Sequence, residues 1–160
     1  MSPTLIKVDP EPVILTEGLT SPAIARNITA TAGGTAGDIA AIAVIVEGTD
    51  LNGDPITETL PAFSADTPAT KKGSLAFKTV TKVTIPAHDG TGATTAIGWD
   101  DALGLPYRLP FGTLLVSARD GSRETSNLPT LATDPDELAA NTITYNGALN
   151  GESLDAYLIV

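Results

Sequence analysis

The sequence contains no cysteine, and only one histidine and one methionine among its 160 residues. The absence of cysteine excludes disulfides, thiolate nucleophiles and cysteine-ligated zinc or iron–sulfur sites. A metal site built from several imidazoles is excluded as well, because His88 has no second histidine to join it. Stability must therefore come from packing or from assembly with other chains.

Basic residues are also few. Nine Lys and Arg stand against 19 Asp and Glu, and the formal charge of −10 repels phosphate backbones and anionic lipid. The longest nearly uninterrupted apolar run, residues 39–46, is far shorter than the ~20 residues that span a bilayer. The first residues lack the basic and apolar regions of a secretory signal. We therefore predict no nucleic-acid partner, no membrane partner and synthesis in the cytoplasm.

Aromatic residues make up only 4% of the chain, whereas it holds 15 Gly, 12 Pro and 23 Thr. This balance disfavours long helices and favours strands joined by tight turns, around a core of Ile, Val and Leu. The length is that of about one domain. We predict an all-β protein, an antiparallel β-sandwich or jelly-roll-like domain over residues 23–160, with one short helix and an extended N-terminal arm.

The arm is predicted over residues 1–22, because prolines at positions 3, 10, 12 and 22 remove backbone donors and favour extended geometry. Two apolar runs within it, residues 5–8 and 13–15, would be costly to leave in water. They either pack on their own domain as edge strands or lie on a neighbouring subunit. Both interpretations stay open, and we take the contact with a neighbour as the hypothesis to test.

Strand patterns recur along the rest of the chain. The Ala, Ile and Val run of residues 39–46 predicts a central strand covered on both faces, in a hairpin with the strand predicted over residues 23–31. The Asn52-Gly53 turn predicts a second hairpin that returns through residues 56–60. Residues 74–85 alternate with period two and predict one strand, the buried face of which carries Leu75, Phe77, Val83 and Ile85.

The C-terminal third predicts further strands and the only helix. Asp134 and Pro135 favour a helix over residues 134–140, with Asp134 as its cap. An apolar C-terminus would need pairing in a sheet or an interface. The strands are predicted at residues 94–98, 111–119, 122–125, 142–145 and 154–160.

Candidate chemistry is sparse. His88 is the single candidate base, but the sequence has no Gly-x-Ser-x-Gly elbow, so we predict a histidine on a surface loop. Asp50, Asn52 and Asp54 have the spacing that opens a calcium loop, yet Pro55 stands where that loop requires glycine. A hairpin turn is the prediction there, with a different kind of cation site as the alternative. We predict no enzymatic activity, no cofactor and no metal.

Charge is unevenly distributed. The lysines at 71, 72, 78 and 82 contrast with residues 124–160, which hold six acidic residues and no basic one. The lysines either form a solvated surface or provide a basic face that meets the acidic segment of another subunit.

Four segments, taken together and in this order, resemble the head decoration, or cement, proteins of tailed bacteriophages. They are VEGTDLNGDPITET (46–59), AFKTVTKVT (76–84), LGLPYRL (103–109) and NTITYNGALNG (141–151). The resemblance implies a non-enzymatic virion protein, a homotrimer on the capsid exterior, which clamps neighbouring copies of the major capsid protein. A tail or fibre protein that binds carbohydrate through loops around Trp99 and Asp89 is the alternative.

No binding motif of that family can be placed residue by residue, so the candidate interface is inferred from apolarity. It consists of Leu5, Ile6, Val8, Val13, Ile14, Leu15, Leu103, Leu105, Tyr107, Tyr157, Leu158 and Ile159.

Overall fold

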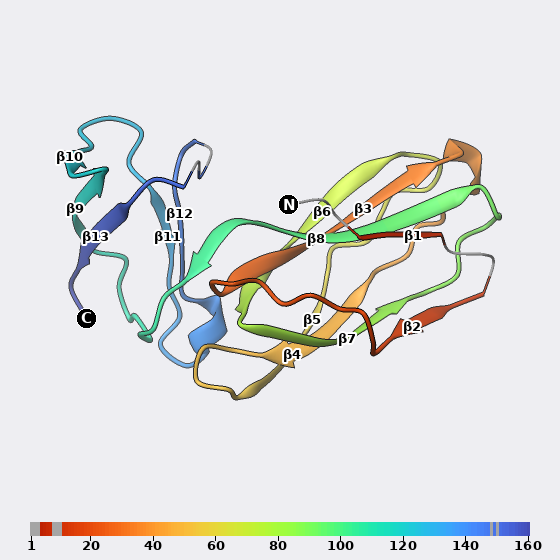
Figure 1. The fold of residues 1–160 in the computed structure, drawn as a ribbon, viewed down its shortest axis with the longest axis horizontal. Coiled ribbons are helices and arrows are strands. Elements are labelled where there is room, and N and C mark those ends of the chain that lie inside the picture. The colour runs from red at the N-terminus through yellow and green to blue at the C-terminus, as the bar shows by residue number, and fades with distance from the viewer. Residues whose placement is uncertain (1–3, 8–10, 148, 150) are drawn as a thin grey trace.

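The computed structural model describes residues 4–7, 11–147, 149 and 151–160, with residues 4–7 described by their backbone alone. The chain is nearly all β, as predicted, and the strand pairs of the described residues are antiparallel (Figure 1). No helix in this part of the chain is long and apolar enough to cross a membrane. The two single 3₁₀ turns of the described residues are η1 (Ala36–Asp38) and η2 (Leu138–Ala140). The strands are β1 (Thr4–Lys7), β2 (Val13–Leu15), β3 (Arg26–Gly34), β4 (Ile45–Thr49), β5 (Pro55–Thr59), β6 (Ala69–Phe77), β7 (Thr79–Ile85), β8 (Ala93–Gly104), β9 (Leu114–Arg119), β10 (Ser122–Arg123), β11 (Thr130–Ala132), β12 (Thr142–Thr144) and β13 (Leu154–Leu158).

The described strands form three sheets. The large sheet has the order β11-β12-β8-β3-β6 with β1 beside β8, the small sheet has the order β2-β7-β4-β5, and the end sheet has the order β10-β9-β13. The large and small sheets enclose one apolar core, which includes Ile28 of the first sheet and Val46 and Val83 of the second. The end sheet lies at the opposite end of the molecule from β2, beyond β11 and β12 (Figure 1).

The predicted single strand over residues 74–85 is two strands in different sheets. β6 ends at Phe77 and β7 begins at Thr79. Between them, the amide of Lys78 donates to the carbonyl oxygen of Thr49 (2.8 Å), and the chain passes from the large sheet to the small one. Phe77 and Val83, both fully buried, therefore face the same core from opposite layers. The burial pattern was predicted correctly, but alternation does not reveal a change of sheet.

The predicted strand over residues 39–46 is wrong for most of its length, because β4 begins only at Ile45. Residues 39–44 are irregular and bond with residues 60–66 instead: the amides of Phe63 and Asp66 donate to the carbonyls of Ile42 and Ile39 (both 2.9 Å). The predicted hairpin with β3 is wrong too, since β3 pairs with β6 and β8. The apolar run reflects burial of Ile39 and Val44 rather than strand geometry.

The predicted Asn-Gly hairpin is confirmed between β4 and β5. One carboxylate oxygen of Asp50 accepts the amides of Asn52 (2.8 Å) and Asp54 (3.0 Å), and Gly53 supplies a φ of +89°. Asp50 is buried. Its oxygen thus stabilises the turn, and no group of three or more acidic or histidine side chains within the described residues is placed to hold a metal ion.

The predicted helix over residues 134–140 is reduced to the single turn η2. Asp134 does accept the amides of Asp136 (2.8 Å) and Glu137 (2.9 Å), and these bonds lower the pKa of its carboxyl group. However, the buried Asn141 side chain donates to the carbonyls of Asp134 (2.8 Å) and Glu137 (2.7 Å) and accepts the amide of Leu109 (2.9 Å). These bonds fix the segment as a loop rather than a helix.

Gly48 allows β4 and β7 to approach closely at the point where their register shifts. A Cβ at Gly48 would lie 2.0 Å from the carbonyl oxygen of Thr79. We expect Gly48→Ala to lower the free energy of unfolding by about 1–3 kcal/mol, as overpacking does. Gly37→Ala is the matched control, because its added Cβ meets nothing within 4 Å. Urea denaturation measures both, and equal effects would contradict the close approach.

Candidate interaction surface

The structure separates the described residues of the predicted interface into two groups, one on the strands of the N-terminal arm and one toward the end sheet. Leu5 and Ile6 lie in β1, where only the backbone is described, and Val8 lies outside the described residues. β1 pairs with β8 and β2 pairs with β7. Both apolar runs of the arm thus contain strands paired with their own domain, the first of the two alternatives.

Within β2, Val13 and Leu15 pack against the core of their own chain. This packing favours the first alternative for these two residues, because alternate residues of an edge strand point toward the core. Ile14, on the other face of β2, is 61% exposed.

The second group lies toward the end sheet. Leu103 and Leu105 are half-buried at the end of β8 and just after it, whereas Tyr107 is exposed. On and after β13, Leu158 is half-buried, but Tyr157 and Ile159 are 63% and 56% exposed. The apolar C-terminus is paired with β9 as a strand, yet this pairing leaves two of its side chains in solvent.

Three further exposed residues complete this surface and were not predicted. Phe111, Leu115 and Val160 are 75%, 56% and 72% exposed. They are neighbours of the C-terminal strand, because Val116 pairs with Tyr157 and the amide of Ile159 donates to the carbonyl of Thr113 (3.3 Å). We call five of the exposed residues at this end the end patch, and it comprises Phe111, Leu115, Tyr157, Ile159 and Val160.

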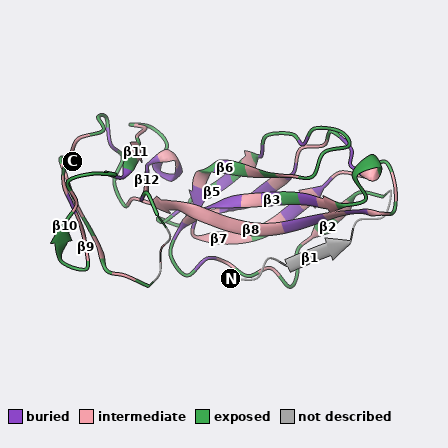
Figure 2. Cartoon of the chain, turned by 90° about the horizontal axis from the view of Figure 1, so that it is seen from above, coloured by how far each residue is buried: buried purple, intermediate pink, exposed green. Residues whose placement is uncertain are grey.

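The sequence does contain a pattern that could have indicated the exposure of Leu115. Leu114 and Leu115 are consecutive in a strand, so a regular strand would place them on opposite faces. Antiparallel sheets commonly pack one face on the domain and leave the other in solvent. Figure 2 shows the contrast between the buried residues within the sandwich and the exposed or half-exposed residues of β9 and β10.

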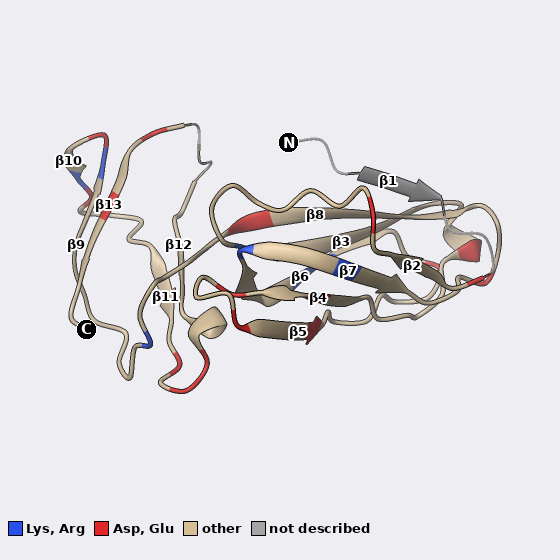
Figure 3. Cartoon of the chain, turned by 60° about the horizontal axis from the view of Figure 1, so that its bottom comes forward, with Lys and Arg blue, Asp and Glu red and all other residues tan. Residues whose placement is uncertain are grey.

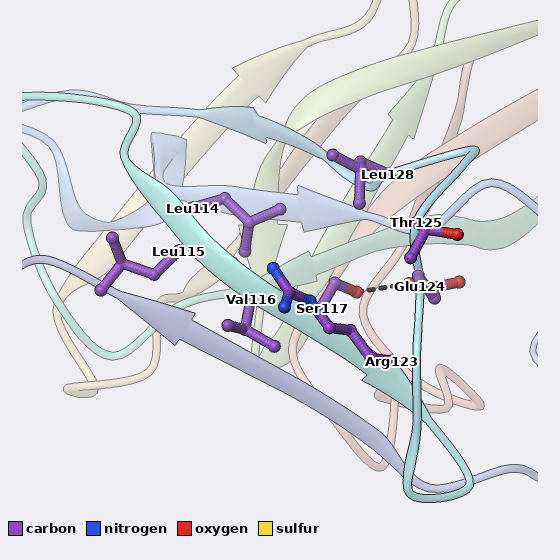
Figure 4. Close-up of a pocket in the computed structure, with 8 residues that line it drawn as sticks. All are labelled: Leu114, Leu115, Val116, Ser117, Arg123, Glu124, Thr125 and Leu128. Carbon is purple, nitrogen blue, oxygen red and sulfur yellow. Dashed lines mark hydrogen bonds between the residues drawn. The ribbon is translucent and has the colours of Figure 1, made fainter.

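Polar interactions, rather than a large apolar core, hold the end sheet together. The hydroxyl of Ser117 on β9 donates to Glu124, which follows β10 (Figure 4). Arg119 forms ion pairs with Glu124 (3.4 Å) and with Glu152 just before β13 (2.6 Å). The hydrogen bond to Glu152 raises the pKa of Arg119. The guanidinium carbon of Arg119 lies 5.8 Å from the centre of the Tyr145 ring, and burial raises the pKa of Tyr145. All three strands are thereby joined.

A cavity of about 230 Å³ lies beside this network, between β9 and the segment after β10. Its lining includes Leu114, Leu128 and Arg123 (Figure 4). Small-molecule sites usually occupy ~300–1,000 Å³. The cavity is therefore smaller than a typical ligand site, and the exposed surface around it is the stronger functional candidate.

His88 is buried, which corrects the prediction of a surface histidine. Its Nδ1 accepts the amide of Ala40 (3.2 Å), so its Nε2 carries the proton and donates to Thr95 (2.8 Å). The ring stacks on Phe63 at 6.3 Å between centroids. Burial lowers the pKa of His88 below its ordinary 6.5, although Asp89 opposes the shift. The imidazole thus has a structural role, joining residue 40 to β8.

The lowered pKa of His88 predicts how stability depends on pH. The unfolded chain takes up a proton on this imidazole as the pH falls through about 6.5, whereas the folded chain takes it up only at a lower pH. The stability that His88 contributes is therefore complete above that pH and is lost below it. We expect the free energy of unfolding to fall less between about pH 7.5 and pH 5 in His88→Gln than in the native chain. An equal fall in both proteins would contradict this assignment.

The structure does not bring together the residues of the carbohydrate-binding alternative. Trp99 is half-buried in β8 and packs against the core, so only part of its ring is open to solvent. Asp89 precedes β8, and at ~3.3 Å per residue Trp99 lies roughly 20 Å from the start of that strand.

The four lysines do not form one basic face. Lys72 pairs with Asp100 (2.5 Å), Lys82 pairs with Glu47 (2.7 Å), and Lys78 donates to the carbonyl of Ala23 (2.9 Å). Lys72 lies in the large sheet and Lys82 in the small one, and Figure 3 shows further basic residues beside β10. Three of the four lysines thus have partners within the chain, which favours the solvated-surface interpretation over contact with another subunit.

Comparisons of the chain with protein-family models, with curated proteins and with solved structures find no match.

Proposed function

We propose that this chain is a structural protein that acts by binding, without chemical turnover, to a larger protein assembly. The observation that carries the proposal is the end patch, in which five large apolar side chains are each more than half exposed. With side chains of ~150–200 Å² each, these five residues together expose about 500 Å² of apolar surface at this end of the molecule. Such a surface is costly in water and is stabilised by a protein partner.

We propose the exterior of a tailed-phage capsid as that assembly, with the major capsid protein as the partner. The resemblance of the four sequence segments supports this choice, and so does the formal charge of −10, because an acidic protein is suited to a surface away from packaged DNA. The resemblance also implies self-association as a homotrimer. The half-buried Trp99, which packs against the core, makes the carbohydrate-binding alternative less favourable.

The proposed mechanism is stabilisation by mass action. A protein that binds the assembled lattice but not its dissociated subunits lowers the free energy of the lattice by RT ln(1 + [L]/Kd) at each site. At a free concentration one hundred times Kd, this amounts to about 2.7 kcal/mol per site. Summed over many sites, a modest affinity resists the internal pressure of packaged DNA.

The double variant Phe111→Ser, Ile159→Ser tests the end patch. We expect its Kd for purified phage heads lacking this protein to rise at least tenfold, because residues of an apolar interface centre each contribute about 1 kcal/mol or more. Co-sedimentation with heads of the phage that encodes the chain measures the affinity.

Ile24→Ser is the matched control, since Ile24 is 61% exposed but precedes β3, outside the end patch. We expect native affinity for this control. If the native chain fails to bind the heads, or if the double variant binds them as tightly as the control, the proposal is wrong.

A further inference from the structure

We infer that two copies of this chain associate through β13, joined edge to edge in antiparallel orientation about a twofold axis at Ala156. Within the described part of the chain, β13 pairs with β9 alone, so its other edge is open. An open strand edge presents unpaired amides and carbonyls, which a second strand can complete.

The hydrogen-bonding pattern identifies which groups lie at the open edge. The amide of Asp120 donates to the carbonyl of Ser153, so this pair is hydrogen-bonded. Because hydrogen-bonded and non-hydrogen-bonded pairs alternate in an antiparallel ladder, Asp155 and Tyr157 bond to β9. The register shifts after Tyr157, but the amide of Ile159 donates to the carbonyl of Thr113, so Leu158 lies between two residues that bond to β9. The backbone groups of Leu154, Ala156 and Leu158 therefore point away from β9. On the other side of β9, the amide of Glu124 donates to the carbonyl of Ser117. Ser117, which lies opposite Ala156, therefore bonds away from β13, as this alternation requires.

The sequence of β13, Leu-Asp-Ala-Tyr-Leu, is nearly palindromic about its central alanine. An antiparallel copy centred on Ala156 sets Leu154 opposite Leu158 of the second copy, and the outward backbone groups of both strands then form hydrogen-bonded pairs. Asp155 lies opposite Tyr157 of the second copy, where the phenol can donate to the carboxylate. The same surface serves both partners, as a twofold interface requires.

Neighbouring registers are less favourable. A centre at Asp155 sets two carboxylates directly opposite each other, and like charges at opposite positions destabilise a strand pair. A centre at Tyr157 sets Asp155 against Ile159, which leaves the carboxylate without the phenol as donor. The register at Ala156 is therefore the one that the side chains of β13 select.

Pairing also addresses the size of the end patch. A single patch of about 500 Å² is smaller than the ~800 Å² that each partner usually contributes to a stable interface. Joining the end sheets brings the two patches to either side of the twofold axis, and together they exceed that value. The twofold arrangement differs from the homotrimer implied by the resemblance.

Sedimentation velocity of the full chain without any capsid tests the inference. We expect a concentration-dependent species of twice the chain mass of 16.3 kDa. Ala156→Pro removes an amide that faces away from β9, a position where an edge strand tolerates proline. We expect this variant to sediment as a monomer with the circular dichroism spectrum of the native chain. A native monomer or trimer, or a folded Ala156→Pro variant that still dimerises, would overturn the inference.

A crosslinking experiment keeps the inference testable if Ala156→Pro does not fold. The chain has no cysteine, so Ala156→Cys adds a single thiol that lies opposite its counterpart in the proposed register. We expect it to form a disulfide-linked dimer under mild oxidation, whereas Ser122→Cys, on exposed β10 of the same sheet, does not. Equal crosslinking of the two variants would refute the register. Because both experiments omit capsids, their outcome is independent of the capsid proposal.

Discussion

The passage of the chain from one sheet to the other beside Lys78 is the constraint on which the fold depends. Residues of β6 and β7 can cover one core from two sides only if the backbone bends between Phe77 and Thr79, and the bond from Lys78 to Thr49 fixes that bend. Gly48 lies where a side chain would strike Thr79. A core with few aromatic residues tolerates little misfit, because small aliphatic side chains stabilise it through close packing.

The end sheet follows a different principle. Its three short strands enclose too little apolar volume for a core of their own, and Arg119 joins them through its ion pairs with Glu124 and Glu152. Polar bonds of this kind fix the geometry but do not cover apolar side chains. Phe111 and Tyr157 consequently stay in solvent. The end sheet, which leaves these apolar side chains uncovered, is therefore the part of the molecule best suited to bind a partner.

His88 and Asp50, which the sequence made candidates for a base and for a cation ligand, are both buried. His88 is occupied by bonds to Ala40 and Thr95, and Asp50 is occupied by the turn that it closes. Function is therefore argued from the surface and not from the fold, since one sandwich architecture serves many unrelated roles. An apolar patch and an open strand edge at the same end of the molecule both point to assembly.

The sequence by itself determined the all-β class, the Asn-Gly hairpin, the burial of Phe77, Val83 and Ile85 and a strand at the C-terminus, because periodicity and turn chemistry are local properties. It did not determine which sheet each strand joins, and so residues 39–44 were mistaken for a strand. It also placed His88 on the surface and overlooked Phe111 and Leu115 as exposed. Exposure depends on which distant segments cover a side chain, and only the tertiary structure decides that.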